Sequence, residues 1–290
     1  MKPEEKEIEK IRSAFSKADS LLEKLEEKLK ARVLCFICHM SITHSVVYRL
    51  NKIIRKFPKE VETLAVLIDS GGGDIDAASK MVKLLRSYCK TYISIIPFFA
   101  KSAATLLAVS ADKVIMCRGA ELGIVDPLVR DPITGIFIPA SSLEEAINFI
   151  RERKDPLIKL SLADKIPPFL MGAYREAREI SRQYLEEAFK KLKKKDEAIY
   201  TFTKKYISHG YPIDREQCRK IIPVEYPEKD LEDTIYDLYE IYTDLWMDLD
   251  EKVKDKEKKG QHLIIHAREG KCVIIAGQDI SNLLLEESEE

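Results

Sequence analysis

The sequence lacks an excess of charge of either sign. Its 48 lysine and arginine residues balance 49 aspartate and glutamate residues, which gives a net charge of −1 over 290 residues. Without a basic excess, no overall positive field favours nucleic acid, and without an acidic excess none favours a basic partner. We therefore expect no nucleic-acid partner.

Cysteine is also scarce, with six residues scattered along the chain. The closest pair, Cys35 and Cys38, has C-x-x-C spacing but lies in an apolar run typical of a buried strand. No second pair of this kind accompanies it, which disfavours a zinc or redox site. Scattered cysteines in apolar surroundings are typical of reduced thiols, so we expect a cytoplasmic protein without a metal or cofactor.

Long hydrophobic runs are absent as well. The first residues, Met1–Glu5, lack the apolar core of a signal peptide, and Lys101 interrupts the most apolar stretch before it reaches spanning length. We expect no membrane span. Hydrophobic residues make up 45% and charged residues 33%, a composition that indicates a globular protein with well-solvated helices. A chain of this length can bury a sizeable core without disulfides.

The first thirty residues show a heptad stripe of apolar side chains among glutamates and lysines, at Ile8, Ile11, Phe15, Ala18, Leu22, Leu25 and Leu29. This spacing predicts an amphipathic helix over residues 1–31. The helix could form an oligomerising coiled coil or lie along its own domain. Four heptads are marginal for an autonomous coil, which favours the second interpretation.

From residue 32 the pattern changes to short apolar runs alternating with amphipathic segments. Continuous apolar strands alternating with helices predict an α/β core over about 32–140, with helices covering the sheet and right-handed crossovers. The predicted strands are Val33–Cys38, Thr63–Ile68, Thr91–Pro97 and Lys113–Cys117, and the predicted helices are Ser45–Phe57, Ile75–Tyr88 and Ser102–Ser110.

Beyond this core the chain is predicted to be mostly helical. A capping box at Ser142–Glu145 opens a helix that ends near Arg153. The other predicted elements are a turn at Asp131–Gly135 with a strand at Ile136–Pro139, long helices at Phe169–Lys195 and Asp230–Lys258, and a hairpin of His262–His266 and Cys272–Ala276. We expect an N-terminal helix over 1–31, a main domain over 32–225 and a C-terminal extension over 226–290.

A glycine-rich segment, Asp69-Ser-Gly-Gly-Gly-Asp74, follows a predicted strand and opens a predicted helix. Its backbone N–H groups can turn toward an anion at the helix N-terminus, which suits either a phosphate or an oxyanion. The spacing matches neither the dinucleotide fingerprint nor the P-loop, so nucleotide binding is disfavoured.

Three further residues are candidates for chemistry. Ser102 stands where a strand ends and a helix begins, which exposes its hydroxyl beside the Ala103 amide. Asp126 precedes a proline in a turn, and His209 lies at a break fixed by glycine and proline. Each has a purely structural alternative, such as helix capping or turn formation. His39, His44, His262 and His266 show no metal-binding spacing.

The segments Asp69–Ala78, Ser102–Asp112 and Glu121–Pro127, in this order, resemble the serine dehydrogenase proteinase family. These proteins are relatives of the Clp peptidases and of signal peptide peptidase A, within the ClpP/crotonase fold. The resemblance continues through Ser208–Ile213 to the terminal hairpin and covers residues 32–280. It implies an α/β, ClpP/crotonase-like β-α-β superhelical core with added helices, peptide or protein substrates and a homo-oligomer.

The resemblance also assigns roles to residues. It implies a serine peptidase with a catalytic triad of Ser102, Asp126 and His209. Gly72, Gly73 and the Ala103 amide would form the oxyanion hole. The chain carries no ATPase motif, so its peptidase activity is expected to be ATP-independent.

Two alternatives stay open at this stage. The first is a Ser-Lys dyad with Lys154, Lys159 or Lys165 as the base, which requires the lysine to be buried. Lys159 has the most apolar neighbours of the three. The second is a catalytically inactive scaffold or interaction protein that keeps the fold.

Overall fold

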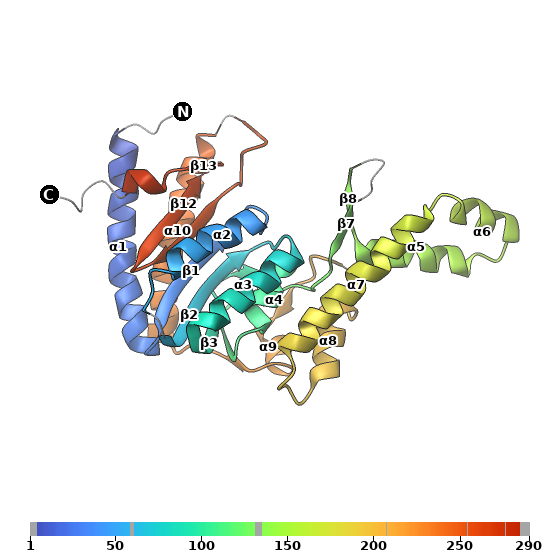
Figure 1. The fold of residues 1–290 in the computed structure, drawn as a ribbon, viewed down its shortest axis with the longest axis horizontal. Helices are drawn as coiled ribbons and strands as arrows, with labels where there is room; N and C mark the ends of the chain where they lie inside the picture. The colour runs from blue at the N-terminus through green and yellow to red at the C-terminus, as the bar shows by residue number, and fades with distance from the viewer. Residues whose placement is uncertain are drawn as a thin grey trace.

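The computed structural model describes residues 5–58, 61–130, 135–206, 208–253, 255–275 and 277–284, and it shows an α/β protein with a central sheet between two layers of helices (Figure 1). The main path of the sheet runs in the order β10 (Val224–Glu225), β5 (Lys113–Met116), β3 (Cys89–Ile96), β2 (Val61–Ser70), β1 (Arg32–Cys38), β11 (Leu263–Ala267), β12 (Gly270–Ile275) and β13 (Gln278–Asp279).

The parallel half of the sheet confirms the predicted β-α-β alternation. Strands β1, β2, β3 and β5 lie side by side and parallel, and the crossover helices are α2 (His44–Ile54), α3 (Ile75–Tyr88) and α4 (Ala103–Val109). Because the strand order advances in one direction, right-handed crossovers place these three helices on one face. Six of the seven residues of β1 are buried, as expected for a strand covered on both sides.

Two long helices cover the opposite face. Helix α1 (Glu5–Leu29) lies along α10 (Lys229–Glu251), and its apolar stripe, including Phe15 and Leu22, is buried in the core. The interface holds a polar network in which His266 of β11 lies 2.7 Å from the Tyr242 hydroxyl and 3.0 Å from the Asp19 carboxylate. The apolar heptad stripe of α1 therefore packs against the core of its own chain. The predicted domain boundaries stay predictions.

The C-terminal hairpin is part of the main sheet. Strands β11 and β12 pair antiparallel as predicted, and β11 also pairs antiparallel with β1. A 3-10 helix at Ser281–Leu284 follows β13. The hairpin thus extends the edge of the parallel strands that would otherwise be open.

The described residues from 128 to 203 form a helical arm that projects from the sheet (Figure 1). A hairpin of β7 (Leu128–Arg130) and β8 (Phe137–Pro139) leads into α5 (Ala140–Glu152), α6 (Pro156–Ala163), α7 (Pro168–Ala188) and α8 (Lys195–Thr203). Part of the turn predicted at Asp131–Gly135 lies outside the described residues. The strand predicted at Ile136–Pro139 is confirmed in β8.

Three helical predictions were wrong in detail. The helix predicted at Phe169–Lys195 ends at Ala188, where a run of lysines would place like charges four residues apart. The helix predicted to reach Lys258 ends at Glu251. Helix α5 begins at Ala140 rather than at the predicted capping box, and Ser142 lies within it.

Three of the two-residue strands that the sequence analysis missed form one row. They are β4 (Phe99–Ala100), β6 (Glu121–Leu122) and β9 (Ile213–Asp214), and they branch from the end of β2 in the order β2-β4-β6-β9. A short helix, α9 (Arg215–Arg219), follows β9. We call this row of strands the site strip, because Ser102, Asp126 and His209 lie within four residues of its strands.

Candidate active site

The site strip brings together segments that are far apart in sequence. Ser70 pairs with Ala100 across β2 and β4, so Gly72 and Ser102 each lie two residues beyond paired positions. Leu122 pairs with Ile213 across β6 and β9, which run antiparallel. Asp126 follows Leu122 by four residues, and His209 precedes Ile213 by four residues. Because β6 and β9 are antiparallel, both residues lie beyond the same end of this strand pair. Backbone register therefore places the four candidates in one region.

The glycine-rich turn approaches the serine so closely that no side chain fits. Gly72 has a φ of 101°, and a Cβ at this position would lie 2.6 Å from the Lys101 carbonyl oxygen and 2.8 Å from the Ser102 Cβ. Gly73 has a φ of 154°, and a Cβ there would lie 2.3 Å from the Ile42 amide nitrogen. The chain needs glycine at both positions, at Gly72 because of the close approach to Ser102 and at Gly73 because of the close approach to Ile42.

Ser102 itself has a strained backbone. Its φ of 51° and ψ of −124° lie in a region that non-glycine residues rarely adopt, and such strain clusters at functional sites. The residue lies two positions beyond β4 and immediately precedes α4, a strand-to-helix turn of the kind that presents the nucleophile in α/β-hydrolases. Thr105 holds the turn by donating to the Ala100 carbonyl at 2.8 Å and accepting from the Gly123 amide.

Two backbone amides beside Ser102 are available to an anion. Within the described part of the chain, neither the Gly73 N–H nor the Ala103 N–H donates a hydrogen bond. The Gly72 N–H, by contrast, donates to the Ser70 hydroxyl at 3.1 Å. The geometry thus favours Gly73 and Ala103 as donors to an oxyanion, with Gly72 serving close packing.

Asp126 is fully buried and already holds two hydrogen bonds. Its carboxylate accepts the Ser141 amide at 3.2 Å and the Ser141 hydroxyl at 2.5 Å, which caps the start of α5. This capping explains why α5 begins before the predicted capping box. Sequence reasoning did not identify Ser141, since nothing in the spacing links it to an aspartate fifteen residues earlier.

His209 lies next to this carboxylate. Its Nδ1 is 3.5 Å from Oδ2 of Asp126, within ion-pair range, but the geometry does not make a hydrogen bond. The ring stands in a tight turn closed by a hydrogen bond from the Tyr211 amide to the Ser208 carbonyl. The stacked rings of Tyr206 and Tyr211, 3.8 Å apart, flank this turn. About a third of the His209 side chain is exposed.

The described residues show no hydrogen bond between Ser102 and His209. Catalytic hydrogen bonds are often long without substrate and shorten when it binds. The three lysines considered for a dyad, Lys154, Lys159 and Lys165, are all exposed in this chain. Lys101, which precedes the serine, pairs with Glu121 at 2.5 Å.

The buried side chain of Asp69 lies next to the glycine-rich turn in sequence and is held by two hydrogen bonds. Asp69, the residue before the last in β2, accepts hydrogen bonds from His39 at 2.7 Å and from the Tyr239 hydroxyl at 3.0 Å. The turn is further fixed by Ile42, whose amide donates to the Gly72 carbonyl and whose carbonyl accepts from the Asp74 amide. Asp74 in turn caps α3 by accepting the Asp76 and Ala77 amides.

Two kinds of feature are absent from the described residues. No described helix is both long and apolar enough to cross a bilayer. No group of three or more histidine, cysteine, aspartate or glutamate side chains in the described ranges could hold a metal ion. The six cysteines form no disulfide with one another.

Comparison with solved structures gives distant likenesses. The membrane-bound stomatin-specific protease 1510-N, solved as a serine-to-alanine variant, is 14% identical, with 67% of this chain and 77% of that chain covered and a TM-score of 0.44. ClpP1 from Listeria monocytogenes is 12% identical, with 71% and 98% covered and a TM-score of 0.42.

Comparison with curated proteins and families is more direct. The uncharacterized protein MJ0137 of Methanocaldococcus jannaschii is 29% identical over 199 residues, 65% of this chain and 61% of that protein. A second uncharacterized protein of that organism, MJ1495, is 25% identical over 65% of this chain and 60% of its own length. The matched region thus spans less than two thirds of either relative. The model of the ClpP-like SDH-type serine proteinases matches residues 9–255. This chain therefore belongs to the family of ClpP-like SDH-type serine proteinases.

Proposed function

We propose that this chain hydrolyses peptide bonds as a serine peptidase, with Ser102 as the nucleophile. The observation that carries the proposal is the strained backbone of Ser102 beside two amides, of Gly73 and Ala103, that lack acceptors in the described part of the chain. A strained serine at a strand-to-helix turn next to free amides is the arrangement that acyl transfer requires.

In this proposal His209 acts as the general base and Asp126 orients it. The Ser102 hydroxyl attacks the scissile carbonyl carbon while its proton passes to Nε2 of His209. The buried Asp126 carboxylate stabilises the imidazolium from the Nδ1 side, across the 3.5 Å that separates the two groups. Asp126 can serve both roles, because its oxygens together accept from Ser141 and face His209.

The remaining steps follow from the same groups. The tetrahedral oxyanion accepts hydrogen bonds from the Gly73 and Ala103 amides. When the C–N bond breaks, His209 returns the proton to the leaving amine, and water then hydrolyses the ester on Ser102 with His209 again taking a proton. No step consumes ATP. The substrate would be a peptide or protein, and the cytoplasmic location stays a prediction from cysteine usage.

The Ser-Lys dyad has less support. A lysine that acts as a base needs a buried environment, yet Lys154, Lys159 and Lys165 lie exposed on or beside α6. Only a second chain packed over α6 would bury them. The dyad and the inactive scaffold are therefore the alternative outcomes of labelling with a fluorophosphonate.

The test is the rate of covalent labelling by a fluorophosphonate, with the modified residue located by peptide mass analysis. We expect labelling at Ser102 that is abolished in Ser102→Ala and reduced at least about a hundredfold in His209→Ala. Ser208→Ala is the matched control, because this exposed serine adjoins His209 without a described role for its hydroxyl. Lys159→Ala should also label at the wild-type rate.

Each contrary result has one meaning. Loss of labelling in Lys159→Ala with retention in His209→Ala would establish the dyad. Absence of labelling in a folded wild-type protein would establish an inactive scaffold.

We also infer that the protein is a homo-oligomer, on the evidence of α6. No residue of this helix is buried, and Leu157, Ile158 and Leu160 are 77%, 50% and 69% exposed. An apolar helix of this kind is unfavourable in water unless another chain covers it. In analytical ultracentrifugation, the Leu160→Asp variant should show a lower assembly mass than the wild type. The Ser161→Asp variant, changed on the same helix, should show the wild-type mass. A monomeric wild type would contradict the inference.

A further inference from the structure

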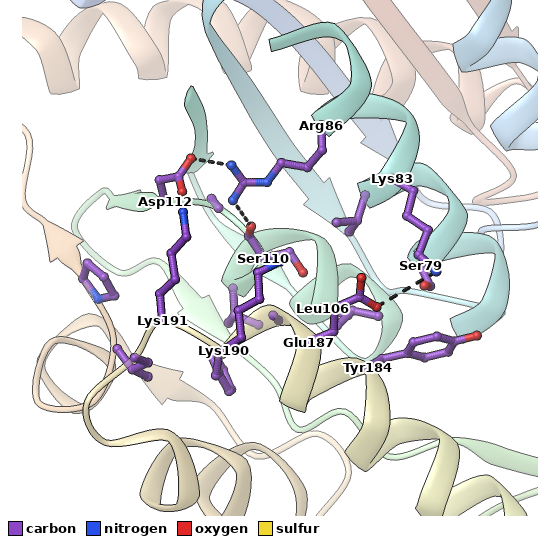
Figure 2. Close-up of a pocket in the computed structure, with 17 residues that line it drawn as sticks. Ser79, Lys83, Arg86, Leu106, Ser110, Asp112, Tyr184, Glu187, Lys190 and Lys191 are labelled. Carbon is purple, nitrogen blue, oxygen red and sulfur yellow. Dashed lines mark hydrogen bonds and ion pairs between the residues drawn. The ribbon is translucent and has the colours of Figure 1, made fainter. Parts of the chain in front are cut away.

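A pocket of about 460 Å³ lies between α3, α4 and the end of α7 (Figure 2). It is separate from the candidate active site: α3 lines it with residues between Ser79 and Arg86 and α4 from Leu106 onward, whereas Gly73 and Ser102 precede the N-termini of these helices. The volume falls within the range of sites for small organic ligands. No residue assigned to catalysis above lines it.

The floor of the pocket is apolar and its rim is basic. Apolar side chains line it from all three helices and from the segment after α7, including Val82, Leu106, Val109, Ala188 and Leu192. Four cations, Lys83, Arg86, Lys190 and Lys191, face two carboxylates, Asp112 and Glu187. The lining therefore combines an apolar surface with an excess of positive charge.

Not all of these cations are available to a ligand. Arg86 pairs with Asp112 and donates to the Ser110 carbonyl at 2.6 Å, so it satisfies the C-terminal end of α4. Lys83 has a long contact of 4.0 Å with Glu187. The described residues provide no hydrogen bond or ion pair within 4 Å to the ammonium of Lys190 or Lys191, although the Lys191 charge acts on Asp112 and helps to lower the pKa of that carboxyl. Figure 2 shows both side chains reaching from the end of α7 toward Ser110 and Asp112.

The surrounding sequence strengthens this charge. Lys193, Lys194 and Lys195 continue the basic run beyond the pocket. Helix C-termini near the pocket contribute partial negative charge, which favours nearby cations. Arg86 already offsets that charge at α4, and the ammonium groups of Lys190 and Lys191 add further positive charge.

We propose that this pocket binds a small amphipathic anion, an aromatic or branched aliphatic group that carries one carboxylate or phosphate. The apolar body would lie against Leu106 and Val109, and the anionic head would lie between Lys190 and Lys191. The site adjoins the far end of the helix that begins after Ser102. The proposal concerns binding only and does not depend on the proposed peptidase activity.

The test uses 4-phenylbutyrate as the probe and its neutral amide as the matched control ligand, with binding measured by calorimetry and by saturation-transfer NMR on the full chain. We expect saturable binding of the carboxylate and about tenfold weaker binding of the amide. Added salt should weaken binding of the carboxylate but not of the amide.

Variants locate the binding site. Lys190→Gln with Lys191→Gln should weaken binding about tenfold, because two charge contacts are lost. Lys193→Gln with Lys195→Gln removes the same charge outside the pocket lining and should change the dissociation constant by less than about twofold. Ala188→Phe should abolish binding by filling the pocket, while Lys190 and Lys191 remain.

The proposal is overturned by any of three results: no saturable binding up to about 10 mM probe, equal affinity for the carboxylate and the amide, or equal loss in the two double variants. The double variants change lysines that are exposed or, at Lys195, partly buried, and they should fold, so a failure of Ala188→Phe to fold would leave these arms decisive.

Discussion

The parallel half of the sheet and the helical arm differ in how much of their apolar surface is buried. In β1, Val33, Leu34 and Phe36 are at most 1% exposed, whereas no residue of α6 is buried. The nucleophile and the oxyanion amides come from the first region, which is packed on both faces. Asp126 and His209 come from segments at the base of the arm. In the proposed enzyme, the core therefore fixes the positions of the nucleophile and the oxyanion amides, and the arm fixes the position of the general base.

Polar contacts hold the base of the arm. Arg178 of α7 lies 3.5 Å from the Glu144 carboxylate and donates to the Thr203 carbonyl. Burial, together with a hydrogen bond to Glu144, raises the pKa of Tyr174 to about 12. The Val125 amide donates to the Phe202 carbonyl at 2.7 Å, which ties the segment of Asp126 to α8. These contacts link the arm to the site strip.

The largest contrast is expected from matched leucine substitutions. Leu34→Ala removes most of a fully buried side chain and leaves a cavity in its place, which should lower the free energy of unfolding by about 3 to 5 kcal/mol. Leu160→Ala should change it by less than about 0.5 kcal/mol in the dissociated chain, because that side chain is 69% exposed. Urea unfolding at low protein concentration measures both. Equal losses would remove the distinction between the two regions.

Matched glycine substitutions should have effects of opposite sign. Gly72→Ala forces a Cβ against the Lys101 carbonyl at a positive φ, so we expect a loss of about 2 to 4 kcal/mol in stability and loss of labelling at Ser102. Gly172→Ala lies on an exposed face of α7 with open space around it, and should stabilise the protein by up to about 1 kcal/mol. Thermal and urea unfolding report both. A tolerated Gly72→Ala would show that the close approach to Ser102 is not needed.

A smaller effect is expected where the two regions join. Ser141→Ala removes the hydroxyl that Asp126 accepts and should cost about 1 kcal/mol in stability. It leaves the Asp126 carboxylate opposite His209, so labelling should fall far less than in His209→Ala. If Ser141→Ala instead matched His209→Ala in labelling, the serine would belong to the catalytic machinery.

The smallest effect is a pH dependence confined to the core. Burial lowers the pKa of His266, and the hydrogen bond that its Nε2 donates to the Asp19 carboxylate offsets this only in part. In the unfolded chain, the His266 side chain binds a proton as the pH falls to the ordinary histidine pKa. In the folded chain, it binds that proton only at a lower pH. Stability should therefore be full above about pH 6.5 and fall as the pH drops through that value.

This dependence can be followed by the fluorescence of Trp246, the single tryptophan, during unfolding at pH 7.5 and 5.5. His266→Gln should reduce the difference between the two pH values. It should not abolish it, because burial also lowers the pKa of His262. The arm has no histidine between residues 140 and 188, so its unfolding should not change over this range. A full wild-type difference in His266→Gln would contradict the assignment.

The sequence predicted the packed half of the fold better than the site strip. Long apolar runs such as Val33–Cys38 show strands directly, because both faces of the sheet are covered. The strands β4, β6 and β9 have two residues each, too short for any periodicity, yet their register brings the candidates together. Only the resemblance to a family linked Asp126 and His209 to Ser102.

Other misses had a visible signal. Helix α6 begins with Asp155 as N-cap and Pro156 in its first turn, a recognisable start that its lack of a polar face concealed. The capping of α5 by Asp126 had no such signal, since it joins residues fifteen positions apart.

The most direct test of the central claim is a crystal structure of the protein after reaction with a fluorophosphonate. The account predicts phosphorus bonded to the Ser102 hydroxyl oxygen, with the phosphonyl oxygen about 2.7 to 3.1 Å from the Gly73 and Ala103 amide nitrogens and the His209 ring beside Ser102. A phosphonyl oxygen directed away from both amides, or an adduct on another residue, would contradict it.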